Sequence, residues 1–210
     1  MKEKQMHLHP VLVGFALIML ALAASLVNQA AAAPGSTAAN EAAFHAFTSK
    51  PDKASKQALQ QYFSEQEIYP IEDWTPEFEQ LILDGHPLAL EVAFESIPYT
   101  DGATSLHRDG LIGKTIMSAP EAFLWGVTRY RSSIRRMDVL AGYLGEEYVD
   151  DLPASIRGLE DRYFSLRNVE SQDYNEARDE VLLLLSERIY KRRERLKEFG
   201  QAMDHVDESE

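Results

Sequence analysis

The stretch LDGHPLALEVAFESIPYTDG, residues 83–102, packs apolar residues between two Asp-Gly pairs. A glycine after an apolar run is a common helix end, because glycine enters the left-handed conformation without a Cβ penalty. A proline two residues later suits the first position of a new helix, where no backbone donor is needed. The stretch therefore predicts a helix that ends at Gly85, a second helix that begins at Pro87 and a turn after Pro98. The apolar seam of the second helix, at spacings of three and four residues, consists of Leu90, Ala93, Phe94 and Ile97.

His86 stands at the junction between these two helices, in the N-cap position of the second. A histidine on a loop can act as a general base or a metal ligand. No second histidine or carboxylate lies at ligand spacing from it in the sequence. We therefore interpret His86 as a polar capping residue.

The residues on both sides contain similar signals for the starts and ends of helices. Thr75 is a candidate N-cap and Pro76 a first helical residue for the helix that ends at Gly85. Residues 106–117, LHRDGLIGKTIM, predict a further helix, and another follows in SAPEAFLWGVTRY. Ser118 and Glu121 have the spacing of a capping box at the start of that last helix.

The two helix pairs are weakly self-similar. Pro87 and Pro120 are 33 residues apart, and under this offset Phe78 aligns with Leu111 and Phe94 with Val127. A period of this size is typical of helical-hairpin repeats. On helix spacing and these two prolines, residues 75–130 resemble the class of helical-repeat proteins that includes HEAT-type arrays. The resemblance implies stacked helical hairpins and brings no functional residues with it.

The remaining chain also has helical periodicity. Short and medium helices are predicted in RMDVLAGYLGEEYV and in LPASIRGLEDRYFSLR, and Asp173 with Glu176 marks the start of a long final helix that runs to about Gly200. No convincing strand pattern occurs. The predicted fold class is all-α: an irregular helical bundle or a short HEAT-like array of helical hairpins, with a long C-terminal helix.

The N-terminus has the layout of an export signal. Lys2 and Lys4 precede a charge-free apolar run over residues 11–27, and NQAAAAPG follows. Ala30 and Ala32 fit the small-residue positions before a cleavage site. The alternative is an uncleaved membrane anchor, since the run lies at the short edge of the roughly 17–25 residues that span a bilayer. We expect an exported chain, periplasmic or secreted.

The predicted domain organisation follows from this. It comprises a signal peptide over residues 1–32, a flexible alanine-rich segment over 33–50, a single helical domain over 51–203 and an acidic tail over 204–210.

Composition excludes several classes of protein. The 210 residues include no cysteine, so disulfides, thiolate metal sites and lipid attachment at a lipobox cysteine cannot occur. The formal charge is −13, from 34 acidic and 21 basic residues. Nucleic acid and anionic lipid repel such a chain, whereas a basic protein partner would be attracted.

Enzyme motifs are incomplete. The triplet at residues 107–109 spells part of a kinase signature and GLIGKT resembles a phosphate loop, but the rest of each motif is missing. No serine-hydrolase elbow or HExxH zinc motif occurs, and we predict no cofactor and no metal. An envelope hydrolase with a site assembled from His86, Asp101, His107 and Asp109 remains an alternative.

Two arginine clusters stand out in this acidic chain. In the second, Arg188, Arg192 and Arg195 share a helix face, and we interpret them as offsetting the helix dipole near its C-terminal end. The first combines arginine with aromatic residues, which is the composition of binding hot spots. The alternative for both clusters is that the arginines pair with the surplus carboxylates and join the helices to one another. The candidate binding residues of the first cluster are Trp125, Arg129, Tyr130, Arg131, Arg135 and Arg136.

These observations favour a binding protein over an enzyme. We predict an exported soluble helical protein that binds another protein in the cell envelope, as an inhibitor or immunity-like protein, an assembly factor or a scaffold. The alternatives are the hydrolase above and a membrane-tethered helical domain that keeps its N-terminal anchor. The identity of the partner and the oligomeric state are left open.

Overall fold

The structure, a computed structural model, describes residues 37–66, 74–99, 102–145, 148 and 150–207, and no strand occurs among them. The prediction of an all-α fold with a long C-terminal helix is therefore confirmed. The elements in chain order are α2 (Thr37–Ser49), α3 (Lys53–Gln66), α4 (Pro76–Leu83), α5 (Pro87–Glu95), the 3₁₀ turn η1 (Ile97–Tyr99), α6 (Gly102–Ser118), α7 (Pro120–Tyr130), α8 (Met137–Gly142), α9 (Leu152–Arg167), the 3₁₀ turn η3 (Gln172–Tyr174) and α10 (Asn175–Asp207).

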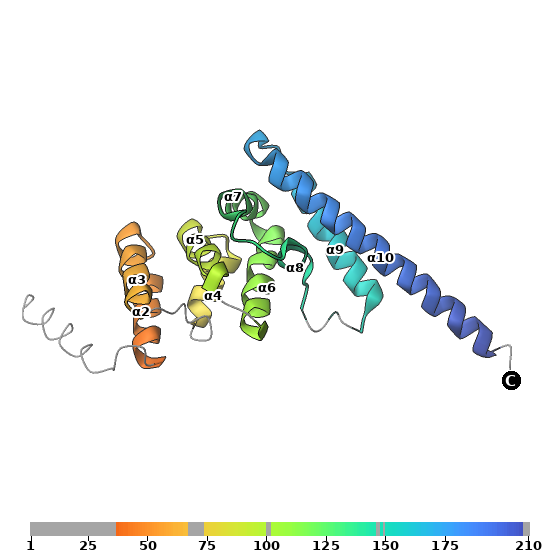
Figure 1. Cartoon of the computed structure of the whole chain (residues 1–210), viewed down its shortest axis with the longest axis horizontal. Coiled ribbons are helices and arrows are strands. Elements are labelled where there is room, and N and C mark those ends of the chain that lie inside the picture. The colour runs from red at the N-terminus through yellow and green to blue at the C-terminus, as the bar shows by residue number, and fades with distance from the viewer. Residues whose placement is uncertain (1–36, 67–73, 100–101, 146–147, 149, 208–210) are drawn as a thin grey trace, which may run out of the picture.

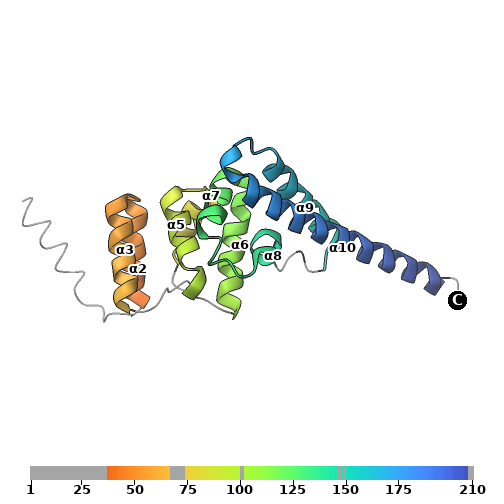
Figure 2. The same cartoon turned by 45° about the horizontal axis from the view of Figure 1, so that its top comes forward.

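The helices from α2 to α7 form three hairpins packed side by side. The helices of each hairpin contact each other, as α2 with α3, α4 with α5 and α6 with α7. In addition α4 contacts both α2 and α6, and α5 contacts both α3 and α7. Successive hairpins therefore add one helix to each of two rows (Figures 1 and 2). This order is that of an array of hairpins, one of the two arrangements that the sequence left open.

The C-terminal helices close one end of these rows. The short helix α8 contacts α6 and α10, and the helix pair α9 and α10 packs along its length. Helix α10 also contacts α7, and its C-terminal part continues past the end of α9 (Figure 1). Helix α8 is thereby placed between the last hairpin and the long helix.

The hairpin of α4 and α5 contains the signals for helix starts and ends that the sequence predicts. The Oγ1 of Thr75 accepts a hydrogen bond from the backbone N of Phe78 at 3.3 Å, with Pro76 at the first helical position. Gly85 follows α4 with a φ of 73°, and Pro87 begins α5. A Cβ at Gly85 would also collide with the Cβ of Ala119, so glycine is required there by both backbone conformation and space.

His86 occupies the predicted N-cap position of α5 but makes no side-chain capping hydrogen bond. Its Nδ1 is buried and has no hydrogen-bond partner among the described residues. The position of His86 was predictable, whereas the capping bond assigned to it does not form.

Two other helix starts differ from the sequence prediction. The hydroxyl of Ser118 donates to the carbonyl of Leu83 at the end of α4, so α7 begins after Ala119 without a side-chain cap. The reason is competition, because the last carbonyls of α4 lack partners within their own helix. At the other site, η3 intervenes and α10 begins at Asn175 instead of directly after Asp173.

The segment predicted as flexible over residues 33–50 is largely helical. Residues 33–36 lie outside the described part of the chain, but α2 packs against α3 and α4. Phe44 and Phe47 of α2 are fully buried. Their spacing of three residues gives the helix one apolar face, which the alanine-rich composition obscured.

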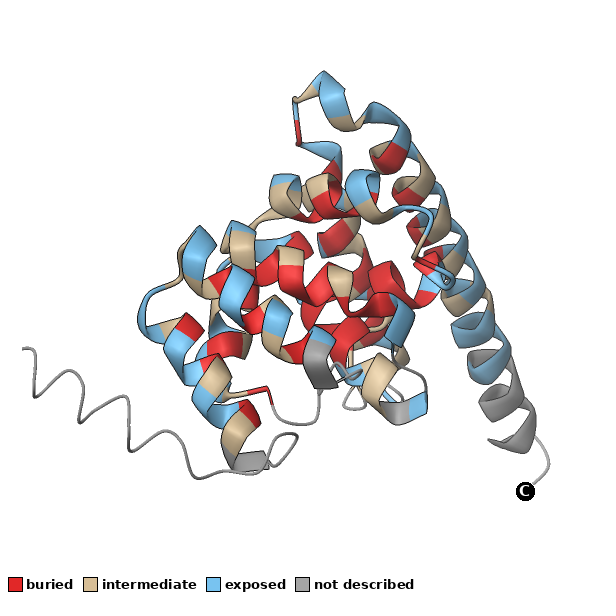
Figure 3. Cartoon of the chain, turned by 60° about the vertical axis from the view of Figure 1, so that its left-hand side comes forward, coloured by how far each residue is buried: buried red, intermediate tan, exposed pale blue. Residues whose placement is uncertain are grey.

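The core follows the rows of helices. Figure 3 shows buried positions concentrated where the helices face one another. At the N-terminal end the core is aromatic: the rings of Phe44 and Phe78 lie 4.8 Å apart between centroids, and Trp74 lies 5.1 Å from Phe78. The predicted seam is buried, with Leu90, Ala93 and Phe94 on α5 and Ile97 on the following turn η1.

Candidate binding site

The six candidate binding residues lie on the C-terminal half of α7 and on the connection to α8, but they do not form one patch. The structure divides them among three neighbours: the α5 side of α7, helix α10, and a pocket beside η1 and α6. Each group has different partners.

The first group combines one exposed arginine with two aromatic rings. The guanidinium carbon of Arg129 lies 5.9 Å from the ring centroid of Trp125 and 5.8 Å from that of Tyr130. The two rings meet edge to face at 6.3 Å. Arg129 Nε is also 3.8 Å from Glu91 Oε1. We call Trp125, Arg129 and Tyr130 the α7 surface.

The α7 surface rests on a rigid support. The ring of Tyr130 stacks on that of Phe94 at 5.7 Å with an interplanar angle of 11°. Its hydroxyl donates to Glu95 Oε1 at 3.2 Å, and the same carboxylate oxygen lies 3.2 Å from the ammonium of Lys56. Because these groups belong to α3, α5 and α7, the ring of Tyr130 is held by three helices at once.

Electrostatics around Tyr130 are consistent with this packing. Burial raises the pKa of Tyr130 to about 12, and the nearby carboxylates of Glu95 and Glu91 add to the rise, while Arg129 opposes it. The hydrogen bond between Arg129 and Tyr130 raises the pKa of Arg129. Tyr130 is therefore neutral at physiological pH and Arg129 is charged.

Arg131 is directed to a different neighbour. Its Nε donates to Glu180 Oε2 of α10 at 2.7 Å, and its Nη2 bonds the second oxygen of the same carboxylate. This hydrogen bonding raises the pKa of Arg131. A two-pronged arginine–carboxylate pair has defined geometry, so Arg131 joins the end of α7 to α10 and is not available as part of the α7 surface.

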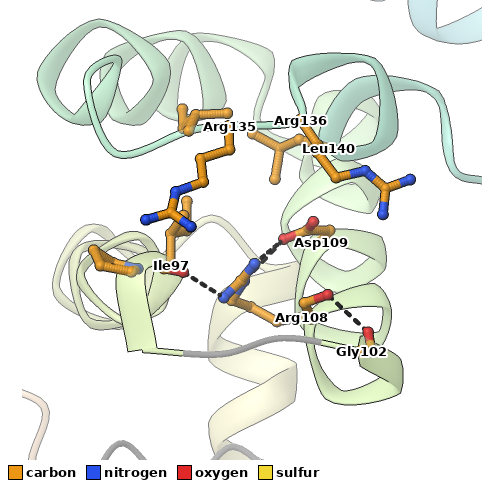
Figure 4. Close-up of a pocket in the computed structure, with 10 residues that line it drawn as sticks. Ile97, Gly102, Arg108, Asp109, Arg135, Arg136 and Leu140 are labelled. Atoms are coloured by element: carbon orange, nitrogen blue, oxygen red, sulfur yellow. Dashed lines mark hydrogen bonds and ion pairs between the residues drawn. The ribbon is translucent and has the colours of Figure 1, made fainter.

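Arg135 and Arg136 line a pocket of about 250 Å³ between the α7–α8 connection, η1 and the first turns of α6 (Figure 4). Arg108 forms its floor with Asp109. The Nε and Nη2 of Arg108 donate to Asp109 Oδ1 at 2.8 and 2.6 Å. Its Nη1 donates to the carbonyl oxygens of Ser96 and of Ile97 in η1, at 3.4 and 3.3 Å.

Arg108 is a member of this pocket that the sequence analysis missed. Arg108 is buried, and Asp109 nearly as completely. Burial raises the pKa of Asp109, and the charge of Arg108 opposes that rise. The available signal was the adjacent pair of opposite charges at the start of an otherwise apolar helical run, because buried charges require partners.

The residues of the hydrolase alternative are engaged elsewhere. His107 Nε2 lies 2.7 Å from Glu79 Oε1 of α4, whereas Asp109 binds Arg108 on another side of α6. His86 has the buried Nδ1 described above, and Asp101 lies outside the described residues. Within the described part of the chain, no three histidine, aspartate or glutamate side chains are grouped so that they could hold a metal ion.

Compared with known proteins, the chain matches no family model, no curated protein and no solved structure. Over the described residues, none of the helices combines the length and the apolar character needed to cross a bilayer. The apolar run at residues 11–27 lies outside those residues, as does the predicted cleavage site.

Proposed function

We propose that this chain is an exported helical protein that binds another protein in the cell envelope, and that the α7 surface is its main contact. Export rests on the basic, apolar and Ala-x-Ala order of the first 33 residues. The roles that we propose for this chain are those of an inhibitor or immunity-like protein, an assembly factor or a scaffold.

The observation that carries this proposal is the exposed Arg129 over two aromatic rings, of which that of Tyr130 is held in place by α3 and α5. The side chain of Arg129 is 58% exposed, yet its guanidinium already lies near the rings of Trp125 and Tyr130. Arginine and aromatic side chains dominate the energetics of protein interfaces. A group held in place before binding loses less conformational entropy when a partner arrives.

The row arrangement of the hairpins supports the same function. Arrays of helical hairpins present extended surfaces formed by side chains from successive helices. The α7 surface is supported by α3 and α5, so it belongs to the row of α3, α5 and α7. A partner that covers it would contact several hairpins.

The experiment compares two variants in affinity capture from the native envelope. The test variant combines Trp125→Ala with Arg129→Ala, and the control is Arg157→Ala, an exposed arginine on α9. We expect wild type and control to enrich the same protein and the test variant to lose it. With the purified partner, removal of a hot spot worth at least 2 kcal/mol weakens binding about 30-fold.

Two results would contradict the proposal. If the test variant enriches the same partner with unchanged affinity, the α7 surface is not the contact. If wild type enriches no envelope protein at all, the proposed function itself is wrong. Thermal unfolding of the test variant, compared with wild type, separates loss of binding from loss of the fold.

A further inference from the structure

The pocket beside η1 is distinct from the α7 surface and has a charge pattern of its own. Among the described residues, its charged lining residues are Arg108, Asp109, Arg135 and Arg136, whose formal charges leave a surplus of two positive charges in a chain of net charge −13. Its other walls are mainly apolar, formed by Ile97, Pro98, Ile134 and Leu140. A pocket that reverses the sign of the chain and offers apolar walls has the features of a ligand site.

The positive charge of Arg108 on the floor of the pocket is already neutralised by Asp109. Arg108 uses three of its nitrogens on Asp109 and on two backbone carbonyls, as described above. The pair is therefore a fixed base for the pocket, and Arg108 does not carry the surplus charge.

The surplus charge belongs to Arg135 and Arg136. Neither forms an ion pair within 4 Å with a described residue, in contrast to the other arginines near α7, since Arg131 binds Glu180 and Arg129 lies 3.8 Å from Glu91. Both are exposed. In Figure 4, Arg135 extends across the pocket toward Ile97 and Arg108, whereas Arg136 points away from Arg135. Arg135 is thus the side chain that meets a group entering the pocket.

We propose that this pocket binds a carboxylate carried on a short hydrocarbon chain, with Arg135 as its direct partner. The planar fork of a guanidinium matches a carboxylate in two parallel hydrogen bonds. The hydrocarbon chain packs on Ile97, Pro98 and Ile134, and Arg136 adds a second positive charge at the rim.

Size and charge select this ligand class. The volume of about 250 Å³ lies below the roughly 300–1,000 Å³ of pockets for drug-sized molecules, so one short acidic group fits. The apolar walls disfavour inorganic phosphate, because phosphate has no hydrocarbon part to pack against Ile97, Pro98 and Ile134. Such a carboxylate belongs either to a glutamate side chain of a protein or to a small free acid.

The test is a titration of the full chain followed by NMR, with three probes at constant ionic strength: glutarate, the blocked amino acid N-acetyl-glutamate amide, and inorganic phosphate. We expect glutarate to shift the Nε–Hε signal of Arg135 and the amides of the α7–α8 connection. Binding of the blocked glutamate with similar affinity would identify a protein side chain as the source. Binding of glutarate alone would identify a free acid.

Variants locate the response. Arg135→Gln is expected to weaken glutarate binding at least about tenfold, because a charge-assisted hydrogen-bond pair is lost. Arg136→Gln, whose guanidinium points away, is expected to weaken it less, and Arg157→Gln on α9 to leave it unchanged. The amide spectrum of each variant reports whether its fold is retained.

Three results would overturn the proposal. Phosphate could shift the same signals as strongly as glutarate, the shifts could spread equally over all exposed arginines, or Arg135→Gln could titrate like wild type. None of these outcomes depends on the α7 surface or on its partner, so the pocket and the proposed function are tested separately.

Discussion

Gly126 of α7 lies directly against the ring of Phe94 of α5. A Cβ at position 126 would overlap the ring edge of Phe94, so the two helices approach at a distance that only glycine allows. One turn further along α7, Tyr130 stacks on the same ring. This approach therefore sets how α5 and α7 pack, and with it the position of the α7 surface.

Gly126→Ala is expected to destabilise the chain. Alanine favours a helix interior by about 1 kcal/mol over glycine, but forcing a methyl group into a packed core costs roughly 1–3 kcal/mol, so the second effect prevails. The free energy of unfolding, measured in urea, is expected to fall. Gly158→Ala in α9 is the control, because its new Cβ would meet only the end of the Leu144 side chain. Equal stability of both variants would contradict this packing.

The starts and ends of the helices in the α4–α5 hairpin could be predicted from sequence, because they depend on residues close together in the chain. Thr75 acts through a side-chain hydrogen bond to a residue three positions on, and Pro76, Gly85 and Pro87 act through their own backbone conformation. The structure has all four in the predicted roles. Ser118 was predicted wrongly because its hydroxyl finds a carbonyl 35 residues away in sequence. A single sequence does not encode such a competitor in any local pattern.

The candidate site was predictable in composition but not in arrangement. The six residues are close in the chain, yet Glu91 and Glu180, which pair with two of them, and Arg108, which lines a pocket with two others, come from three other helices. Which neighbour each arginine meets depends on how α5, α6 and α10 pack around α7. Periodicity predicts which face of a helix is buried, and it does not predict which helix covers that face.

Arg162 of α9 is expected to be essential for the local fold around α8. Its Nη1 donates to the carbonyl oxygens of Ala141 and Tyr143 at 2.6 and 3.1 Å, at the C-terminal end of α8. Burial lowers the pKa of Arg162 to about 10, and the charge of Arg188 adds to the effect, so the group stays charged at neutral pH.

Arg162→Met keeps the volume of the side chain and removes both donors. An unsatisfied buried acceptor costs about 1–3 kcal/mol, so we expect the free energy of unfolding to fall by about 2 kcal/mol or more. Arg157→Met, on the exposed side of the same helix, is expected to stay within about 0.5 kcal/mol of wild type. Urea unfolding of both variants measures the difference, and similar values for the two would show that the carbonyl contacts contribute little.

We predict that Asp52 makes the folding stability of the chain depend on pH. It precedes α3, where its Oδ1 accepts a hydrogen bond from the backbone N of Ser55 at 2.9 Å. This hydrogen bond, together with Lys50, lowers the pKa of Asp52 from 3.8 to about 2. The folded chain therefore holds the proton less tightly than the unfolded chain does. The stabilisation by Asp52 is complete above pH 3.8 and is lost as the pH falls toward 2.

Asp52→Asn isolates this effect, because asparagine still accepts the capping hydrogen bond but does not titrate. We expect wild type to be more stable than Asp52→Asn at pH values above 3.8, and the difference to shrink as the pH falls from 3.8 toward 2. Urea unfolding at a series of pH values measures it. A difference that is independent of pH over this range would show that the charge of Asp52 does not stabilise α3.

The predicted export signal can be tested through the position of its cleavage site. If Ala30 and Ala32 occupy the positions three and one residues before the scissile bond, the exported product begins at Ala33. A bulky residue at Ala32 then blocks cleavage, because that site accepts only small side chains, whereas the same substitution at Ala31 is tolerated. We expect Ala32→Leu to leave the full-length chain in the membrane fraction and Ala31→Leu to release a product whose N-terminal residue is Ala33. N-terminal sequencing and fractionation distinguish them. A wild-type product that begins at Met1 and stays with the membrane would instead establish the tethered alternative, in which residues 11–27 hold the helical domain at the bilayer surface.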